Sequence, residues 1–444
     1  MLPDSRASTS IDVAMSLTPG ERIEVAVEKP AAGGRMIARY DGQVVLVQGA
    51  IPGERVAARI DRVAPRLAFA SVERVLAASP DRTEPLADPR CGGCVYAHIT
   101  YARQLALKGE VVADAFTRIG RLPLPGDVRI AASPPRAYRM RARLHVRGTR
   151  VGFYREGTHE LCDASATGQL TDAAVDAAAS AVCALDAAGA GAASIELTEN
   201  VAGDERVIHV EPAPGVRVTE AMLDEAVRSG ALTGCTMRDA NVLRTAGVPV
   251  VRDPLTVLTA GRARTGELQR HAESFFQANR FLLPSLVAAV MDAVLPDRDV
   301  LDLYAGVGLF SVSLASSGRE GIVAVEGDRS AAADLQRNAS AYGPAVRVVS
   351  GSVEDYLARR AGERIGTVIV DPPRTGISKR AIDAALHLRP RRIVYVSCDP
   401  ATMARDARRF VDGGYRLLSL EGFDLFPNTP HVEAVGVFDP EGTK

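Results

Sequence analysis

The chain has 444 residues, of which 47% are hydrophobic and 24% are charged, and its formal net charge is -1. This balance is typical of a soluble globular protein of two to four domains, and it excludes attraction of nucleic acid through an overall positive charge. The first 20 residues hold no apolar run of the signal-peptide type, and the most apolar later stretch, 300–316, is interrupted by Asp302 and by glycines. We therefore expect a cytoplasmic protein.

The N-terminal block begins with polar residues 1–18, for which we expect disorder. Residues 19–77 then contain five short β-rich runs broken by Gly-Gly, Asp-Gly and Pro-Gly. So many short strands in so short a stretch predict a small OB-like barrel. Barrels of this kind commonly bind single-stranded nucleic acid, although the fold alone does not assign that function.

Residues 78–265 mix helical and extended patterns, which predicts an α+β central domain. Between Arg136 and Arg155 there are seven arginines, Arg141 and Arg143 among them, and no acidic residue. Interleaved aromatic residues would offer faces on which bases stack, so the stretch suits a track for RNA: Tyr138, Phe153 and Tyr154. An ordinary solvated strand face is an equal alternative, because the whole chain has 49 arginines against 4 lysines.

Six cysteines stand at positions 91, 94, 162, 183, 235 and 398. They are too few and too scattered for a disulfide scaffold, so we expect reduced thiols with separate roles. Cys183 and Cys235 are expected to be core residues.

Residues 266–444 repeat strand-turn-helix units, the pattern of a doubly wound α/β sheet. The run 300–310 is an expected strand that ends in a glycine turn at Gly306 and Gly308, where a ligand can approach the backbone closely. Glu326 closes the next strand, where a carboxylate can accept hydrogen bonds from ribose hydroxyls. A dinucleotide site would have a third glycine at position 311, which is serine, so we favour S-adenosylmethionine over a nicotinamide dinucleotide.

Two further features follow the expected strands of this block. Asp371 comes directly after an apolar strand and by position overlooks the methyl group of the donor, although a carboxylate that caps a loop before proline is the alternative. Cys398 ends a strand-like run and enters a turn, and Glu433 stands at the mouth of another expected strand. We therefore expect the thiol and the carboxylate of Glu433 to face one pocket.

A thiol, a base and a methyl donor fit one reaction. Carbon 5 of a uracil ring is a poor nucleophile, but addition of a thiolate at carbon 6 produces an enolate whose carbon 5 can attack an electrophilic methyl group. A base must then remove the carbon-5 proton so that the thiol can leave. Cys398 and Glu433 would supply these groups, and a small buried cysteine at a strand end is the alternative for Cys398.

Five ordered motifs carry a family resemblance: SFFQAN from Ser274, DLYAGVGLFS from Asp302, DPPRTG from Asp371, IVYVSCDPATMARD from Ile393 and FPNTPHVE from Phe426. Together they resemble the class I S-adenosylmethionine-dependent RNA uracil-5 methyltransferases, which make 5-methyluridine. The run GGRMIARYDGQVVLVQGAIPGE looks like the TRAM domain of the 23S ribosomal RNA branch of that family, and CGGCVYAHITYARQLALK and YRMRARLHV look like its central domain. The resemblance covers nearly the whole chain and implies a Rossmann-like class I methyltransferase domain.

Position by position, the resemblance implies that Cys398 is the nucleophile and Glu433 the base. Phe275 and Asp371 would shape the pocket of the target uracil. The donor S-adenosylmethionine would contact a larger set: Gln277, Tyr304, Gly306, Gly308, Glu326 and Asp371. RNA would bind the barrel and the arginine track, including Arg141 and Arg143, and its target uridine would flip into the cleft between the central and catalytic domains.

Members of the iron-sulfur type of this family hold a 4Fe-4S cluster with four cysteines. Here Cys91 and Cys94 keep the CGGC pair, but no cysteine precedes them in the sequence, and the last ligand position falls near Thr167, with Cys162 five residues earlier. The candidate metal ligands Cys91, Cys94 and Cys162 therefore form an incomplete set. The alternative is a glycine turn between packed thiols that no longer hold a metal.

The sequence thus predicts a monomeric, S-adenosylmethionine-dependent RNA (uracil-C5) methyltransferase with ribosomal RNA as its substrate and no membrane partner. Transfer RNA is the alternative substrate. From a different class, the chain could be a non-catalytic RNA-binding or assembly protein that keeps the fold. Cys398 and Glu433 favour the enzyme, because a scaffold needs neither.

Overall fold

The structure is a computed structural model that describes residues 17–239, 242–296, 299–360 and 364–442. The expected disorder of residues 1–18 falls mostly outside these ranges, although Leu17 is buried and the Thr18 amide donates to Glu21 (2.9 Å). The chain divides into two compact units between Thr83 and Glu84. Within the described part of the chain, no helix is long and apolar enough to cross a membrane.

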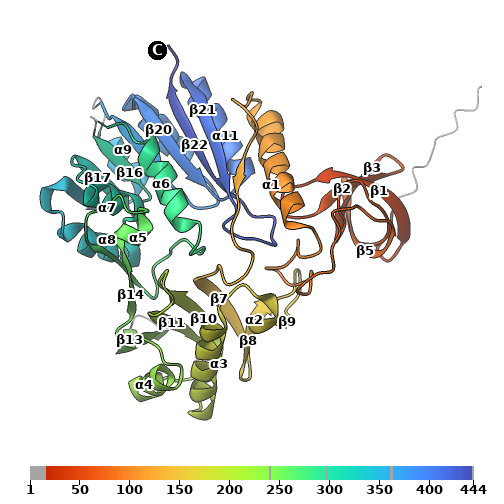
Figure 1. The fold of residues 1–444 in the computed structure, drawn as a ribbon, viewed down its shortest axis with the longest axis horizontal. Helices are drawn as coiled ribbons and strands as arrows, with labels where there is room; N and C mark the ends of the chain where they lie inside the picture. The colour runs from red at the N-terminus through yellow and green to blue at the C-terminus, as the bar shows by residue number, and fades with distance from the viewer. Residues whose placement is uncertain (1–16, 240–241, 297–298, 361–363, 443–444) are drawn as a thin grey trace, which may run out of the picture. The chain divides into compact units, whose positions relative to one another are not determined.

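The first unit is a closed five-stranded barrel of order β1-β2-β3-β5-β4 (Figure 1). Apolar and polar side chains alternate along its strands, so that one set, including Val25, Val45 and Ile60, fills the interior. The turn after β2 needs positive φ at Asp41 (45°) and Gly42 (81°), which suits a two-residue hairpin. The strands are β1 Arg22–Pro30, β2 Met36–Tyr40, β3 Gln43–Gln48, β4 Arg55–Ala64 and β5 Leu67–Ala77.

The second unit contains a mixed seven-stranded sheet of order β13-β12-β11-β10-β7-β8-β9. Helix α3 covers it with an alanine-rich face, and Thr171 caps the start of that helix by accepting from the Ala174 amide (3.1 Å). The strands are β7 Arg141–Arg147, β8 Arg150–Tyr154, β9 Leu161–Asp163, β10 Ala192–Glu199, β11 Arg206–Pro212, β12 Gly234–Asp239 and β13 Val242–Gly247. The helices are α2 Ala164–Thr167, α3 Asp172–Ala187 and α4 Glu220–Ser229.

The second unit also contains an eight-stranded sheet of order β18-β17-β16-β19-β20-β22-β21-β6, shown mostly in blue in Figure 1. The five strands β16 to β20 run parallel to one another, and β22 is antiparallel to β20. The strands are β6 Ile130–Ala131, β16 Val300–Leu303, β17 Ile322–Glu326, β18 Val346–Ser350, β19 Thr367–Val370, β20 Arg392–Ser397, β21 Tyr415–Phe423 and β22 Glu433–Pro440. This arrangement confirms the predicted Rossmann-like class I methyltransferase sheet.

Helices flank this sheet on both faces: α6 Leu283–Ala293, α7 Leu309–Ser316, α8 Arg329–Ser340, α9 Val353–Ala358, α10 Lys379–His387 and α11 Pro400–Asp412. Smaller elements are a π-helical turn Phe116–Gly120, a 3-10 turn Gly343–Ala345, a hairpin of β14 Val250–Pro254 and β15 Glu267–His271, and the short helix α5 Leu255–Leu258.

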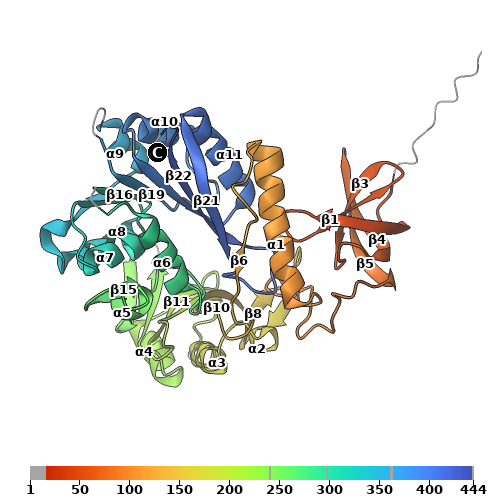
Figure 2. The same ribbon diagram turned by 45° about the horizontal axis from the view of Figure 1, so that its top comes forward.

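Helix α1, Tyr101–Ala115, packs on the eight-stranded sheet rather than on the seven-stranded one. It contacts α11 and β6, and Figure 2 shows it in orange beside β21 and α11. The edge strand β6 pairs with β21. Part of the stretch 78–265 therefore contributes to the C-terminal sheet.

Candidate active site

A glycine turn follows β16 at the carboxyl end of the parallel strands. Gly306 (φ 57°) and Gly308 (φ 95°) have left-handed backbones, and a Cβ on Gly308 would lie 2.7 Å from Val312 Cγ2 and 2.8 Å from Leu335 Cδ1. The Gly306 amide donates to Glu326 Oε2 (2.7 Å), which ties the turn to the end of β17. Only glycine fits at position 308, and Gly306 in the same turn is half-buried, so a ligand can approach its backbone.

Three carboxylates meet beneath and beside this turn. Asp302 is 0% exposed; its Oδ2 accepts from the Ser311 amide (3.1 Å), and its Oδ1 has no hydrogen-bond partner in the described structure. Burial raises the pKa of Asp302 to about 7, and the charge of Glu326 adds to this effect. Burial and the charges of Asp302 and Glu326 raise the pKa of Asp371 to about 7 as well.

This concentration of carboxylates suits a cationic ligand. S-adenosylmethionine carries a sulfonium and an ammonium group, and both are favoured near ionised acids from which water is excluded. The residues present therefore fit the donor. Tyr304 joins them with a left-handed backbone (φ 61°) between β16 and the glycine turn.

The sulfur of Cys398 and the carboxylate of Glu433 come together across a strand pair. Cys398 directly follows β20, Glu433 is the first residue of β22, and the antiparallel register pairs Ser397 with Ala434. Glu433 is 3% exposed, whereas Cys398 is half-buried and open to a ligand. The strand pairing thus places the expected nucleophile beside the expected base.

Burial, followed by the charges of Glu433 and Asp371, raises the pKa of Cys398 to about 11, and Arg374 opposes this effect. Burial and the charge of Asp371 raise the pKa of Glu433 well above its ordinary value, and Arg374 again opposes them. Glu433 is therefore a stronger base than an exposed glutamate. Arg374 thus favours the ionised forms of both groups.

The sequence analysis assigned no role to Arg374. The pattern that could have indicated one is DPPR, which directly follows a buried strand. Its loop is held in place by Asp406, whose Oδ2 accepts from the Ile377 amide (3.0 Å) and from the Tyr395 hydroxyl (3.0 Å). At Gly376 (φ 78°) a Cβ would lie 2.2 Å from Thr402 Cγ2. The loop that carries Arg374 therefore packs closely on α11.

Phe275 and Gln277 lie on the segment that follows β15. Phe275 is 67% exposed, and the Arg141 guanidinium lies 5.1 Å from the centre of its ring, whereas Gln277 is buried. Asp334 on α8 accepts from the hydroxyl of Ser274 (2.7 Å) and fixes the start of the segment. An exposed aromatic ring beside a cation offers a surface on which a base can stack.

The arginine stretch is less positive than its sequence indicates. Arg141 pairs with Glu196 on β10, and Arg143 pairs with Glu211 on β11. Arg155 pairs with Asp88 (3.0 Å) and with Glu160.

The expected stacking role of the interleaved aromatics is wrong for two of the three rings. Tyr138 is 0% exposed and Phe153 is buried in the core. Tyr154 is half-buried and stacks on His145, with ring centroids 3.6 Å apart. These rings fill space between strands, and bases cannot reach Tyr138 or Phe153.

Three thiols gather between the central sheet and the CGGC turn. Cys91 lies within hydrogen-bonding reach of Cys94 and Cys162, and the Cys94 thiol donates to the Thr167 carbonyl (3.9 Å). Hydrogen bonding to Cys94 and burial raise the pKa of Cys91, and burial raises that of Cys162 to about 12.

A 4Fe-4S cluster needs four thiolates. The resemblance puts the last ligand position near Thr167, which is not a cysteine, and no group of three or more His, Cys, Asp or Glu side chains in the described ranges is arranged to hold a metal ion. The residues present therefore do not fit the cluster.

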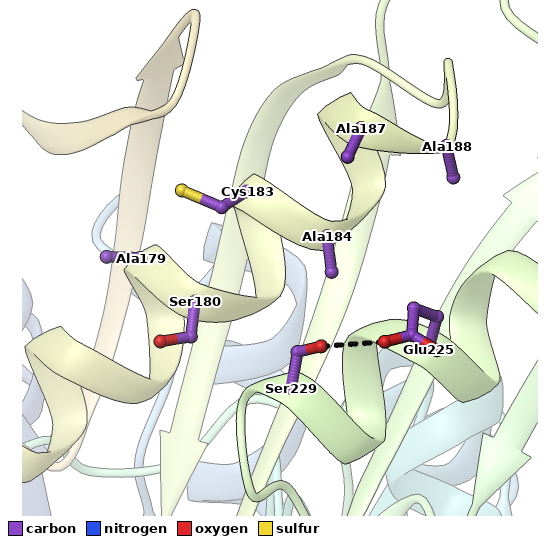
Figure 3. Close-up of a pocket in the computed structure, with 8 residues that line it drawn as sticks. All are labelled: Ala179, Ser180, Cys183, Ala184, Ala187, Ala188, Glu225 and Ser229. Carbon is purple, nitrogen blue, oxygen red and sulfur yellow. Dashed lines mark hydrogen bonds between the residues drawn. The ribbon is translucent and has the colours of Figure 1, made fainter.

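A separate hollow of about 810 Å³ lies between α3 and α4 (Figure 3). Small side chains line most of it, and Ser229 donates to Glu225 at one side (3.0 Å). Cys183, expected in the core, is exposed on this rim because α3 turns that face away from the sheet, whereas Cys235 is buried as expected.

Comparison with known proteins gives consistent likenesses. A family model described as tRNA (Uracil-5-)-methyltransferase matches residues 251–440, and a TRAM domain model matches residues 16–72. A protein named 23S rRNA (uracil(1939)-C(5))-methyltransferase RlmD from Pseudomonas putida is 32% identical, with 95% of this chain and 94% of that protein covered. An RNA methyltransferase from Streptomyces avermitilis is 34% identical over 95% of this chain and 99% of its own length.

Among solved structures, the tRNA (uracil-54, C5)-methyltransferase of Pyrococcus abyssi in complex with S-adenosyl-L-homocysteine matches with a TM-score of 0.73 and 23% identity. The match covers 93% of this chain and 99% of that one. It shows that the two proteins share a fold.

Proposed function

The chain belongs to the S-adenosylmethionine-dependent RNA (uracil-C5) methyltransferases, and from this premise we propose that Cys398 and Glu433 form 5-methyluridine in ribosomal RNA. The observation that carries the proposal is the register of β20 and β22, which sets the two side chains side by side. Their neighbours Asp371 and Arg374 complete one cluster.

The reaction begins with the sulfur of Cys398. As the thiolate, it adds to carbon 6 of the uracil and makes carbon 5 nucleophilic. Arg374 favours the thiolate, because its positive charge offsets the nearby carboxylates. Once carbon 5 carries the transferred methyl group, Glu433 accepts the proton from carbon 5, and the electron pair of that bond expels the sulfur from carbon 6. Cys398 is thereby regenerated, and the uracil ring regains its double bond.

The bound donor supplies an electrophilic methyl group to carbon 5. The chain's own residues bind and orient it: the backbone at Tyr304, Gly306 and Gly308, the carboxylates of Glu326 and Asp371, and the side chain of Gln277. Each oxygen of Glu326 accepts one backbone amide, from Gly306 (2.7 Å) or Asp328 (2.6 Å), and keeps a lone pair for a ribose hydroxyl.

Ribosomal RNA is proposed because the relatives from Pseudomonas putida and Bordetella pertussis carry the name of a 23S rRNA methyltransferase and match over more than nine tenths of this chain. The target uridine leaves its stack and enters the cluster beside Phe275, with Arg141 and Arg143 at neighbouring phosphates. The protein acts as a monomer in the cytoplasm. Transfer RNA is the alternative substrate, supported by the name of the family model.

One experiment tests this proposal. The purified protein is incubated with labelled donor and with 23S ribosomal RNA or transfer RNA that carries tritium at uracil carbon 5. With ribosomal RNA, we expect one tritium to be released to water for each methyl group transferred to the RNA. Cys398→Ala should abolish both signals, and Cys183→Ala, which changes an exposed thiol far from the cluster in sequence, should change neither. Release from transfer RNA alone would reassign the substrate, and unchanged methylation by Cys398→Ala would refute the mechanism.

A further inference from the structure

Helix α1 fixes the loop from which the proposed base emerges. We propose that Lys108 and Gln104 are positioning residues for Glu433: by holding residues 424–428, they set the carboxylate where it can remove the carbon-5 proton. This inference rests on the proposed function. It assigns a catalytic consequence to a helix outside the motifs that carry the chemistry.

Lys108 is a buried cation that serves this loop. It is 1% exposed, and its Nζ donates to Asp424 Oδ1 and to the Phe426 carbonyl (3.0 Å). Asp424 is 0% exposed. Burial of an ion pair gives little net stability, because both charges lose their water, and such pairs are instead suited to fixing one geometry. The pair therefore points to a requirement for placement.

Gln104 holds the other end of the loop. Its Nε2 donates to Asn428 Oδ1 (3.0 Å), and its Oε1 accepts from the Asn428 amide (2.9 Å). The Tyr96 amide donates to the Asn428 carbonyl (2.8 Å). Asn428 has a left-handed backbone (φ 62°), which asparagine adopts more readily than other non-glycine residues.

The carbonyls between these two ends are also held. Asn279 Nδ2 donates to the Leu425 carbonyl (3.1 Å), and the Tyr138 hydroxyl donates to the Pro427 carbonyl (3.4 Å). The carbonyls of residues 425–428 thus accept from side chains or backbone of several separate segments. A loop held at successive positions has one conformation, and β22, with Glu433 as its first residue, begins after the four further residues 429–432.

The charge of Lys108 also reaches the site. His431 lies two positions before Glu433, and burial, with the charges of Arg374, Lys108 and Arg139, lowers its pKa to about 4, against the opposing charge of Asp399. The imidazole is therefore neutral at physiological pH. Burial is the main cause of this neutrality, and the charge of Lys108 adds to it.

The order of bond changes gives a readout specific to the base. Addition of Cys398 and methyl transfer precede proton removal, so an enzyme with a misplaced base stalls as a covalent adduct between Cys398 and methylated RNA. A merely structural role of Lys108 would instead lower the amount of folded enzyme. The fraction of enzyme bound covalently to RNA during turnover therefore separates the two roles.

The test compares Lys108→Met, Gln104→Met and the double variant Lys108→Met/Asp424→Asn, which leaves no unpaired charge. Glu433→Gln is the reference for a stalled base. Arg118→Met is the matched control, because Arg118 lies just beyond the end of α1 and forms an exposed ion pair with Asp114 in the last turn of that helix. Adduct is measured by denaturing electrophoresis with labelled 23S ribosomal RNA and S-adenosylmethionine, beside kcat and KM.

We expect a tenfold or greater rise in adduct in the Lys108 and Gln104 variants, with kcat lowered up to about a hundredfold and KM for RNA nearly unchanged. The inference is overturned if Glu433→Gln accumulates adduct whereas the folded double variant and Gln104→Met turn over without it. Absence of adduct in Glu433→Gln itself would instead refute the role of Glu433 in the proposed function.

Discussion

Replacement of Asp302 by Asn should stabilise the protein without its donor and impair its activity. Asp302 is 0% exposed, and its Oδ1 has no hydrogen-bond partner in the described structure. Its ionised form therefore destabilises the folded protein when no cationic ligand is bound. Burial raises its pKa from 3.8 to about 7. A carboxyl group whose pKa is raised in the folded state destabilises that state at pH values above the raised pKa. This destabilisation disappears as the pH falls towards the pKa of the group in the unfolded chain.

The magnitude follows from the shift. A displacement of the pKa from 3.8 to about 7 corresponds to about 4 kcal/mol at pH 8. At pH 5 most of the folded protein binds the proton, and the difference falls to about 2 kcal/mol by the same relation. Asparagine has a similar shape and can still accept a hydrogen bond from the Ser311 amide. The variant therefore lacks the destabilisation by the buried charge at every pH.

Urea unfolding at pH 8 and pH 5, followed by circular dichroism, measures these differences. We expect Asp302→Asn to be the more stable protein at pH 8, with a smaller advantage at pH 5 and a higher KM for the donor. Asp383→Asn, at an exposed position of α10, is the control and should change stability by less than about 0.5 kcal/mol. An equal difference at both pH values would show that packing, and not charge, is responsible.

Three further outcomes are expected. The kcat/KM for tritium release should rise about tenfold per pH unit below the Cys398 pKa of about 11. At pH 8, Arg374→Ala should lower this kcat/KM more than Arg374→Lys does, and equal values for the two variants would show that the charge of Arg374 has no part in catalysis. Arg141→Ala and Arg143→Ala should each reduce the salt slope of RNA binding by about 0.9, and an unchanged slope would assign both arginines to internal ion pairs only. Anaerobically purified protein should lack the visible absorption of an iron-sulfur cluster, and stoichiometric iron with such a band would contradict the incomplete ligand set.

The sequence predicted what depends on local pattern. Short β-rich runs broken by turn residues predicted the barrel, and strand-turn-helix units predicted the class I sheet. The meeting of Cys398 and Glu433 was also expected, because both stand at the ends of apparent strands. The strand β21, however, was not foreseen, and it forms the hairpin that brings β22 back beside β20.

What the sequence could not predict depends on partners from distant segments. The arginine stretch contains no acid, yet Glu196 and Glu211 arrive from neighbouring strands and pair with Arg141 and Arg143. Tyr138 was indistinguishable from an exposed ring, because burial is decided by the elements that cover it. The contacts of α1 with residues 424–428 span most of the chain, and no local spacing records them.

The proposed reaction requires a transient bond between Cys398 and a uracil ring. It is tested most directly by incubating Glu433→Gln with donor and RNA, digesting the product, and sequencing the cross-linked peptide by mass spectrometry. We expect a uridylate that carries one additional methyl group and is joined to Cys398. A cross-link at any other residue, or 5-methyluridine formed by Cys398→Ala, would contradict it.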